Sequence, residues 1–239
     1  RPPRSTPLYS SAASDVYKRQ FKYGVTRDFV RRLRMVTALG DVIDVDRPGE
    51  TPGLEVLVGS EGTLGILTRV ELRLIQHPAS RALRAAVFKD PLVALSSVPE
   101  LLDTGLVPAK LEFIDAQTIQ AIERARPHGL PADAGAVLLV EFDGEPSDVE
   151  KDEQLLLDVL AKSDHGVDVV GAEIARRWWM ARRGLTASLG RIRPAKIGED
   201  ICVPRRALAD TYSLIRCEAD RLGIPLAVFG HAADGTLHP

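Results

Sequence analysis

After residue 80, short apolar runs alternate with segments of helical periodicity. This alternation constrains the fold of the chain more than any other feature. Short apolar runs predict strands, and the stretches with helical periodicity between them predict helices. The expected strands cover residues 83–88, 111–114, 136–142, 167–170, 197–203 and 226–229, and the expected helices cover 91–102, 116–126, 148–162, 172–189 and 206–222. This order predicts stacked βαβ-type units, in which helices pack on one sheet.

The region before residue 78 has a different pattern. Residues 29–37 alternate apolar and charged side chains, and Leu39-Gly40-Asp41 predicts a tight turn into a second short strand. We interpret the apolar segment 54–57 as a strand and expect another strand, with one buried face, at 66–75. His77-Pro78 interrupts the pattern, so we place a domain boundary there, between domains 21–77 and 78–239.

We expect the first 20 residues to be non-native. They have no hydrophobic period, and Ser10–Gln20 matches the translation of an adapter used in transposon-based sequencing libraries. A basic, serine-rich transit peptide is the alternative. The native part is then expected to start at Phe21 and to be a fragment, because the chain also stops within a motif at Leu237-His238-Pro239.

Composition excludes several classes of protein. The formal net charge of −2 offers no electrostatic footprint for nucleic acid, and aromatic residues make up only 5% of the chain. No apolar run reaches the roughly 20 residues that a transmembrane helix needs. Two cysteines, Cys202 and Cys217, cannot form a disulfide framework; we expect both to be buried in a protein of a reducing, cytoplasmic compartment.

A glycine-rich segment is the first candidate binding site. In Gly59-Ser60-Glu61-Gly62-Thr63-Leu64-Gly65, three glycines within seven residues permit positive φ angles and a close approach to the backbone. Exposed backbone N–H groups in such a loop can hold a phosphate or the polar edge of a flat cofactor. The spacing matches neither the Walker A motif nor the dinucleotide fingerprint, and a purely structural loop remains the alternative.

Arg182 and two histidines are the candidate catalytic residues. Arg182 follows Trp178-Trp179 on an expected helix, where a guanidinium can bind a carboxylate with two hydrogen bonds. His231 and His238 flank a polar turn after a buried strand, and neutral imidazoles suit a divalent transition metal, although two ligands do not complete a site. Core tryptophans with a solvated arginine, and two unrelated loop histidines, are the alternatives.

Acidic residues in an expected strand are the last candidate feature. Glu199 and Asp200 lie in the segment Lys196–Pro204 and need a partner if they are buried, for which Arg182, Arg191 or a cofactor rim are candidates. An edge strand with solvated acids is the alternative. The remaining histidines, His77, His128 and His165, are expected to be structural.

Five segments occur in the order found in one protein family: LVGSEGTLGIL, PAKLEFID, LLVEFDGEPSDVE, RPAKIGEDICVPRRAL and FGHAADGTLHP. On these segments the chain resembles the FAD-linked oxidase family of vanillyl-alcohol-oxidase-type (PCMH-type) flavoproteins. Within that family it is most similar to the FAD subunit of glycolate oxidase and to D-lactate dehydrogenases. The match extends over nearly all of the chain after residue 20.

The resemblance implies an α+β fold in two parts. Residues 21–77 would be the C-terminal half of a PCMH-type FAD-binding domain, with Gly59–Gly65 along the flavin, and residues 78–239 a ferredoxin-like α/β cap domain over the substrate. The family's substrate arginine corresponds to Arg182, and Lys196 corresponds less closely to a substrate lysine. The family's metal-site histidines correspond to His231 and His238, which with a downstream Glu-His pair would hold a divalent metal such as zinc.

The implied reaction is the oxidation of a D-2-hydroxy acid, of the glycolate or D-lactate type, to the 2-oxo acid by hydride transfer to FAD. A quinone, a cytochrome, an iron–sulfur partner subunit or oxygen would accept the electrons. We expect a cytoplasmic protein, with peripheral attachment to a membrane as the alternative. The alternatives are a flavin transferase like alkylglycerone-phosphate synthase, and a non-catalytic chain. We expect the fragment itself to be inactive, because the family's pyrophosphate-binding segment would lie upstream of Phe21.

Two residues depart from the family's histidine motif. Ala233 stands where glycine is usual, and Thr236 where asparagine is usual. Neither change removes a candidate ligand, but Ala233 has to tolerate the backbone conformation of the turn.

Overall fold

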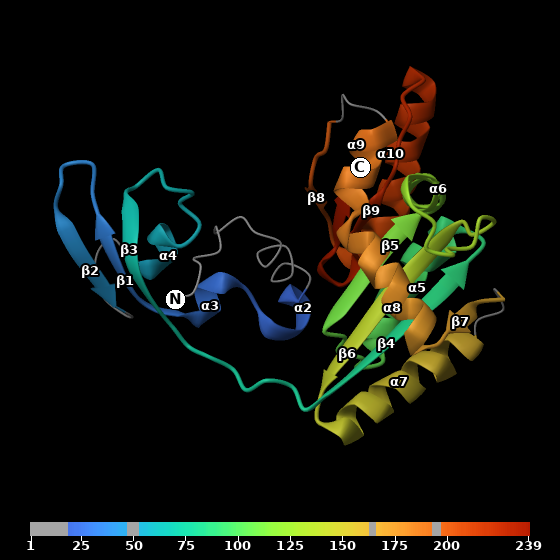
Figure 1. The fold of residues 1–239 in the computed structure, drawn as a ribbon, viewed down its shortest axis with the longest axis horizontal. Helices are drawn as coiled ribbons and strands as arrows, with labels where there is room; N and C mark the ends of the chain where they lie inside the picture. The colour runs from blue at the N-terminus through green and yellow to red at the C-terminus, as the bar shows by residue number, and fades with distance from the viewer. Residues whose placement is uncertain (1–18, 47–52, 163–165, 193–196) are drawn as a thin grey trace. The chain divides into compact units, whose positions relative to one another are not determined.

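The computed structural model describes residues 19–46, 53–162, 166–192 and 197–239, in two compact units (Figure 1). The units are Arg1–His77 and Pro78–Pro239, and each is described by itself. The predicted adapter, apart from its last two residues, and Lys196 lie outside the described residues. In the described part of the chain, no helix combines the length and the apolar composition that crossing a bilayer requires.

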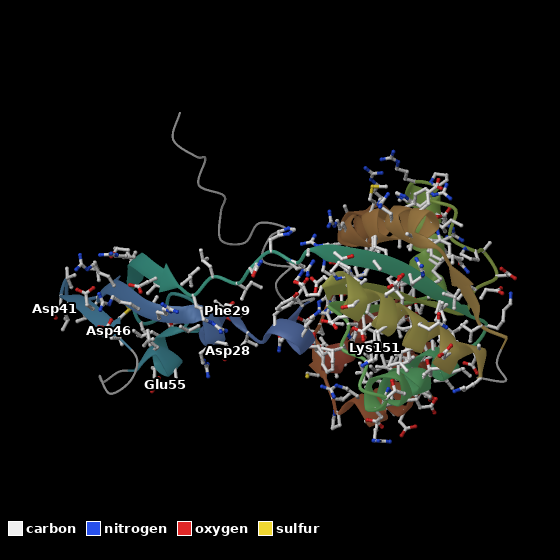
Figure 2. The ribbon with its side chains drawn as sticks, turned by 90° about the horizontal axis from the view of Figure 1, so that it is seen from below. Asp28, Phe29, Asp41, Asp46, Glu55 and Lys151 are labelled. Carbon is white, nitrogen blue, oxygen red and sulfur yellow. The ribbon has the colours of Figure 1, made fainter. Side chains whose placement is uncertain are left out.

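The N-terminal unit is built on a three-stranded antiparallel sheet in the order β2-β1-β3. Its elements are α2 (Gln20–Tyr23), α3 (Thr26–Phe29), β1 (Val30–Val36), β2 (Val42–Asp46), α4 (Leu54–Leu57) and β3 (Ile66–Leu72). The predicted hairpin is confirmed: Val36 pairs with Val42, and Gly40 provides the positive φ of 88° that the turn requires. Figure 2 shows Asp41 at this turn and Glu55 on α4.

Two predictions for this unit are wrong. Residues 54–57 form a helical turn and not a strand, because Leu54 and Leu57, three residues apart, both point into the small core. Strand β3 forms as expected but has no buried face, since all seven of its residues are exposed. Among the described residues, the buried members of the core come from β1, β2 and α4, and β3 pairs only along the edge of β1.

The C-terminal unit contains a seven-stranded sheet in the order β7-β4-β6-β5-β9-β10-β8, in which every recorded pair is antiparallel. Its first half comprises β4 (Ser80–Phe88), α5 (Pro91–Asp103), β5 (Lys110–Asp115), α6 (Ala116–Ala125), β6 (Ala136–Gly144), α7 (Pro146–Ala161) and β7 (Asp168–Val170). Strands joined through a helix, such as β4 and β5, are separated in the sheet by an antiparallel third strand. The predicted βαβ units are therefore split units, and the order β7-β4-β6-β5 confirms the expected ferredoxin-like architecture.

The second half of this unit extends the sheet beyond β5. It comprises α8 (Ala172–Arg183), α9 (Leu185–Ile192), β8 (Ile201–Cys202), a 3-10 turn at Arg205–Ala207, α10 (Leu208–Leu222), β9 (Phe229–His231), a second 3-10 turn at Ala232–Asp234, and β10 (Thr236–His238). Helix α8 lies across the sheet in Figure 1, and its residues Ala175 and Trp178 share a buried cluster with Ala85 and Leu139. Strands β9 and β10 therefore belong to the same sheet on which α8, the helix that carries Arg182, packs.

Asp115 connects three elements of this unit. Its carboxylate accepts a hydrogen bond from the Thr118 backbone N–H at 2.8 Å, which confirms the predicted N-cap of α6. The same carboxylate forms an ion pair with Arg216 of α10, with Nη2 and Oδ2 2.7 Å apart. Helix α10 ends at Gly223, whose left-handed φ of 65° confirms the predicted stop.

Several predicted boundaries are wrong. The helix expected over 172–189 breaks at Gly184, whose N–H bonds to the carbonyls of Ala181 and Arg182 and closes α8. Neither Ser147 nor Asp148 caps α7, which begins at Pro146. The strand expected over 197–203 shrinks to β8, the strand expected over 226–229 shifts to β9, and β10 was not predicted. Strands of two or three residues are too short to produce a periodic signal.

The prediction that both cysteines are buried is also wrong. Cys202 and Cys217 are free and exposed. Cys202 lies on β8, the edge strand of the sheet, and Cys217 lies on α10. The buried residues of α10 are Leu208, Tyr212 and Ala219, and at 100° per residue Cys217 lies on the opposite face of that helix.

Candidate functional site

Strand register places the two candidate histidines on β9 and β10, between β5 and the edge strand β8. Glu112 of β5 pairs directly with His231 of β9, and His238 of β10 pairs with Phe229. Side chains two residues apart on a strand point to the same face. Glu112, Phe229, His231 and His238 therefore share one face of the sheet, and Arg182 of α8 contacts that face.

Glu112 joins the candidate arginine to the first candidate histidine. Its carboxylate is fully buried, with Oε1 2.6 Å from Nδ1 of His231 and Oε2 2.7 Å from Nη2 of Arg182. The second contact is an ion pair and not a well-aligned hydrogen bond. A buried carboxylate is costly unless opposite charge and donors surround it, and Arg182 and His231 supply both.

Aromatic contacts complete the group. The guanidinium carbon of Arg182 lies 4.7 Å from the ring centroid of Phe229, and the Phe229 ring lies 5.1 Å from that of His238. The rings of His231 and His238 meet edge to face, with centroids 5.0 Å apart. The arginine and the two histidines predicted from the sequence are therefore neighbours in one cluster.

Both histidines point Nδ1 at a carboxylate. His238 Nδ1 contacts Oδ1 of Asp200, and burial lowers the pKa of His238 below its usual value, although Asp200 opposes that shift. An ionised carboxylate only accepts hydrogen bonds, so each neutral imidazole carries its proton on Nδ1. This tautomer leaves the Nε2 lone pair of both rings available as a base or as a metal ligand.

Asp234 is a further acidic residue close to His231 and Glu112. Sequence analysis did not identify it as a candidate site residue. Burial raises its pKa to about 6, and the charge of Glu112 adds to the rise, whereas His231 and Arg205 oppose it. A carboxylic acid with a pKa in this range exchanges its proton near neutral pH.

Two glycines fix the turn that carries the histidines. A Cβ on Gly230 would lie 2.1 Å from the Thr236 carbonyl oxygen, and a Cβ on Gly235 would lie 2.1 Å from the Val203 carbonyl oxygen. Ala233 lies in a 3-10 turn and does not have a positive φ angle, so the departure from glycine there is tolerated. Arg205 Nε donates to the Ala233 carbonyl at 2.7 Å and holds this turn against the start of α10.

The glycine-rich segment lies in the other unit and has an open side. Thr63 N–H donates to the Ser60 carbonyl at 2.9 Å, and Glu61 and Gly62 between them have φ angles of 51° and 79°. Positive φ at both central positions is the mark of a type I′ turn. A Cβ on Gly59 or Gly62 would meet no atom within 4 Å, whereas one on Gly65 would lie 2.5 Å from the Val36 carbonyl oxygen, so the segment is open at its first two glycines and packed at its last.

Other predicted partners are not part of the cluster. Glu199 and Arg191 are exposed, and the partner of Asp200 is His238 and not an arginine. Lys196 and His165 lie outside the described residues, so the structure says nothing of their predicted roles. Sequence analysis missed Glu112, which lies within the PAKLEFID segment, although an acid among apolar residues in a predicted strand is itself a signal.

The donor set provides two ligands for a divalent metal and does not complete a site. Among the residues that the structure describes, no three His, Cys, Asp or Glu side chains are placed to hold a metal ion. The metal therefore remains a prediction.

The fold is that of the cap of a PCMH-type flavoprotein, and its cluster holds Arg182 beside two imidazoles. Residues 77–239 match the family described as FAD linked oxidases, C-terminal domain, and the chain belongs to that family. The expected resemblance is confirmed.

Named relatives agree with this family. The chain is 37% identical to the glycolate oxidase subunit GlcD of Bacillus subtilis, over 92% of this chain and 48% of the relative. It is 28% identical to the D-lactate dehydrogenase of Anaerostipes hadrus, over 92% of this chain and 49% of the relative. The chain thus spans about half the length of the curated relatives that it matches.

Solved structures share the fold at low sequence identity. An alkyldihydroxyacetonephosphate synthase superposes with a TM-score of 0.68 at 16% identity, covering 92% of this chain and 45% of that one. A p-cresol methylhydroxylase with substrate bound superposes with a TM-score of 0.66 at 13% identity, covering 88% of this chain and 51% of that one. Because enzymes of different chemistry share it, this fold does not specify the reaction.

Proposed function

We propose that the protein to which this chain belongs oxidises a D-2-hydroxy acid, of the glycolate or D-lactate type, to the 2-oxo acid with FAD. The observation that carries the proposal is the cluster in which Glu112 contacts both Arg182 and His231, with His238 beside them. A cation for a carboxylate and an imidazole lone pair for a hydroxyl proton are the two groups that this substrate class needs.

The names of the relatives support the substrate class. They include glycolate oxidase subunits, D-lactate dehydrogenases and a D-2-hydroxyglutarate dehydrogenase. Glycolate, lactate and 2-hydroxyglutarate share one feature, a hydroxyl group on the carbon next to a carboxylate. The proposal is therefore limited to 2-hydroxy acids as a class, and the experiment below determines which side chain on the hydroxyl-bearing carbon is accepted.

Arg182 is proposed to orient the substrate carboxylate. Nη2 of its guanidinium lies against Glu112, and its face lies against Phe229, so the side chain is held in one position. A fixed guanidinium binds a carboxylate with defined direction, and correct orientation of a substrate can supply several kcal/mol of rate acceleration.

His231 and His238 are proposed to act on the substrate hydroxyl. The Nε2 lone pair of one of them, when no metal occupies it, can accept the single O–H proton as the C–H hydride leaves. Flavin, when bound, supplies the hydride acceptor for this oxidation. We also propose Gly59–Gly65 as part of the flavin contact. A divalent metal at the two histidines, completed by the downstream Glu-His pair, is the alternative use of the same Nε2 lone pairs, and that pair would then also supply the base.

Anaerobic reduction of the flavin tests this proposal. The gene is completed from its genomic reading frame, the protein is purified with FAD, and glycolate, D-lactate, L-lactate and D-2-hydroxyglutarate are added without oxygen. We expect the flavin absorbance to bleach with at least one 2-hydroxy acid, and with D-lactate faster than with L-lactate. A flavin that no 2-hydroxy acid reduces would contradict the proposal and would favour a synthase that performs no net oxidation.

The electron acceptor is tested in the same preparation. Quinone analogues, cytochrome c and oxygen are compared as oxidants of the reduced flavin, and proteins that co-purify are examined for an iron–sulfur cluster. We propose that one of these acceptors restores the oxidised flavin in the cytoplasm or at a membrane surface. Reoxidation by none of them would remove this part of the proposal.

A further inference from the structure

Glu112 is the most deeply buried charged group of the cluster. It lies in β5 between β6 and β9 and has no exposed surface. Each carboxylate oxygen faces a different element: Oε1 faces His231 of β9 at 2.6 Å, and Oε2 faces Arg182 of α8 at 2.7 Å. One side chain therefore links the proposed base to the proposed carboxylate-binding cation.

We propose that Glu112 is a positioning residue that fixes His231 in the Nδ1–H tautomer and holds Arg182 beside it. The inference rests on the proposed function, because it assigns a role within the same site. Glu112 does not touch the reacting atoms; it determines which ring nitrogen of His231 keeps a lone pair. It also fixes the separation between that lone pair and the guanidinium.

The two histidines are not held equally. The carboxylate of Glu112 is fully buried, whereas that of Asp200, which contacts His238, is 79% exposed. Water competes for an exposed carboxylate and weakens its hold on a partner. We therefore expect the tautomer of His231 to be more strictly determined than that of His238.

Glu112→Gln is the informative substitution, because it keeps size and shape but removes one acceptor. An amide has a single acceptor oxygen, and its NH2 group only donates. The buried guanidinium of Arg182 attracts the amide oxygen, so the NH2 group faces His231. Nδ1 of His231 must then become the acceptor, and its proton moves to Nε2. The substitution should therefore reverse the tautomer and remove the Nε2 lone pair.

Nitrogen-15 NMR of the histidine rings measures this directly. Long-range 1H–15N correlation spectra of the 239-residue chain distinguish a protonated ring nitrogen from an unprotonated one, and single His→Ala variants assign the five histidines. We expect His231 to be Nδ1–H in the natural chain and in Glu112→Asp, and to become Nε2–H in Glu112→Gln. His238 should not change in any of these variants.

Glu141→Gln is the matched control. Glu141 is also a buried carboxylate, on the neighbouring strand β6, but the ion pair recorded for it is with Lys110. The Glu141→Gln substitution should leave the tautomer of His231 unchanged. An Nε2–H tautomer of His231 in the natural chain would overturn the proposal even if Glu112→Gln did not fold. An unchanged tautomer in folded Glu112→Gln, or the same change in Glu141→Gln, would overturn it as well.

Turnover of the complete protein provides the second measurement. Outer partners of functional histidines typically change activity by about 10–100-fold when they are lost. We expect Glu112→Gln to lower kcat within that range while FAD content is retained, and Glu112→Asp to recover part of the loss. Normal kcat and KM in Glu112→Gln would overturn the positioning role. If the natural protein oxidises no 2-hydroxy acid, the proposed function fails, and the tautomer measurement still decides the role of Glu112.

Discussion

Lys110 and Glu141 form a buried ion pair across β5 and β6, with Nζ of the lysine 3.1 Å from Oε2 of the glutamate. The ammonium group also lies 5.3 Å from the ring centroid of Trp179 on α8. Lys110 is two residues before Glu112, so both charged pairs lie on the sheet face that α8 covers. Polar groups thus cross an otherwise apolar interface between the helix and the sheet.

Breaking this pair should destabilise the C-terminal unit. Glu141→Gln removes the carboxylate from this pair, and the loss of one partner of a buried ion pair costs about 3–5 kcal/mol. The double variant Lys110→Met/Glu141→Leu should recover much of the loss, because apolar replacement of a whole buried pair is often neutral. Urea unfolding, monitored by circular dichroism, measures the free energy of unfolding of each variant. A double variant that loses as much as the sum of the single variants Lys110→Met and Glu141→Leu would show that the residues do not interact.

Replacing Gly235 by alanine should destabilise the turn that carries the histidines by more than the strain of a positive φ angle alone. Its φ is 79°, and a Cβ there would lie 2.1 Å from the Val203 carbonyl oxygen. Gly223 is the matched control, because its φ is 65° but a Cβ there would meet no atom within 4 Å.

We expect Gly223→Ala to cost about 1–2 kcal/mol, from left-handed strain alone. Gly235→Ala should cost about 1–3 kcal/mol more, because the Val203 backbone that follows β8 has to move to accommodate the methyl group. Thermal and urea unfolding of the two variants gives the comparison. Equal losses would mean that the Val203 backbone shifts at no cost and that the close contact does not constrain the turn.

The Arg34–Asp44 pair of the N-terminal hairpin should be visible in a carboxyl titration. Arg34 donates two hydrogen bonds to Asp44, with Nε–Oδ1 and Nη2–Oδ2 distances of 2.9 and 2.8 Å, and these bonds lower the pKa of Asp44 below its usual value. Because the folded pKa lies below the unfolded one, the pair contributes stability above the unfolded pKa. That stability is lost as the pH falls through the folded pKa.

NMR titration of the Asp44 carboxyl carbon should therefore give a midpoint below 3.8, the ordinary aspartate value. In Arg34→Gln the midpoint should rise. Both side chains are largely exposed, so salt should reduce the difference between the two proteins. A midpoint of Asp44 that does not respond to Arg34→Gln would show that the two side chains do not pair in solution.

The sequence allowed the members of the site to be identified but not the contacts between them. Arg182, His231 and His238 were selected because a guanidinium and imidazoles suit a carboxylate and a metal, and the resemblance placed them in one site. Glu112 lies 119 positions before His231, and only the β5–β9 pairing brings them together. A contact over that separation depends on sheet order, which local periodicity does not encode.

The fold was predictable where elements are long and not where they are short. Strands β4 and β6 and helices α5 and α10 have clear patterns, a proline at the first helical position or a glycine stop. Strand β10 has only three residues and is defined by its pairing with β9 and β8. The helix break at Gly184 went unnoticed because a single glycine within an otherwise helical pattern is often tolerated.

The predicted metal can be tested by removing one ligand candidate from the completed protein. The structure places His231 and His238 with ring centroids 5.0 Å apart and with both Nδ1 atoms at carboxylates. If both Nε2 atoms bind a divalent metal, His231→Ala should lower metal content, measured by inductively coupled plasma mass spectrometry, and kcat together. Loss of a general acid–base group alone typically lowers kcat by about 10²–10⁴-fold.

His128→Ala is the control, since His128 lies in the loop after α6 and outside the cluster. It should change neither metal content nor kcat. Dialysis against a chelator should reproduce the loss of activity in the natural protein, and added zinc or manganese should restore it. If His231→Ala lowers kcat but the natural protein contains no metal and resists the chelator, the imidazole acts as a base alone. Full activity with unchanged metal in His231→Ala would exclude both roles for this histidine.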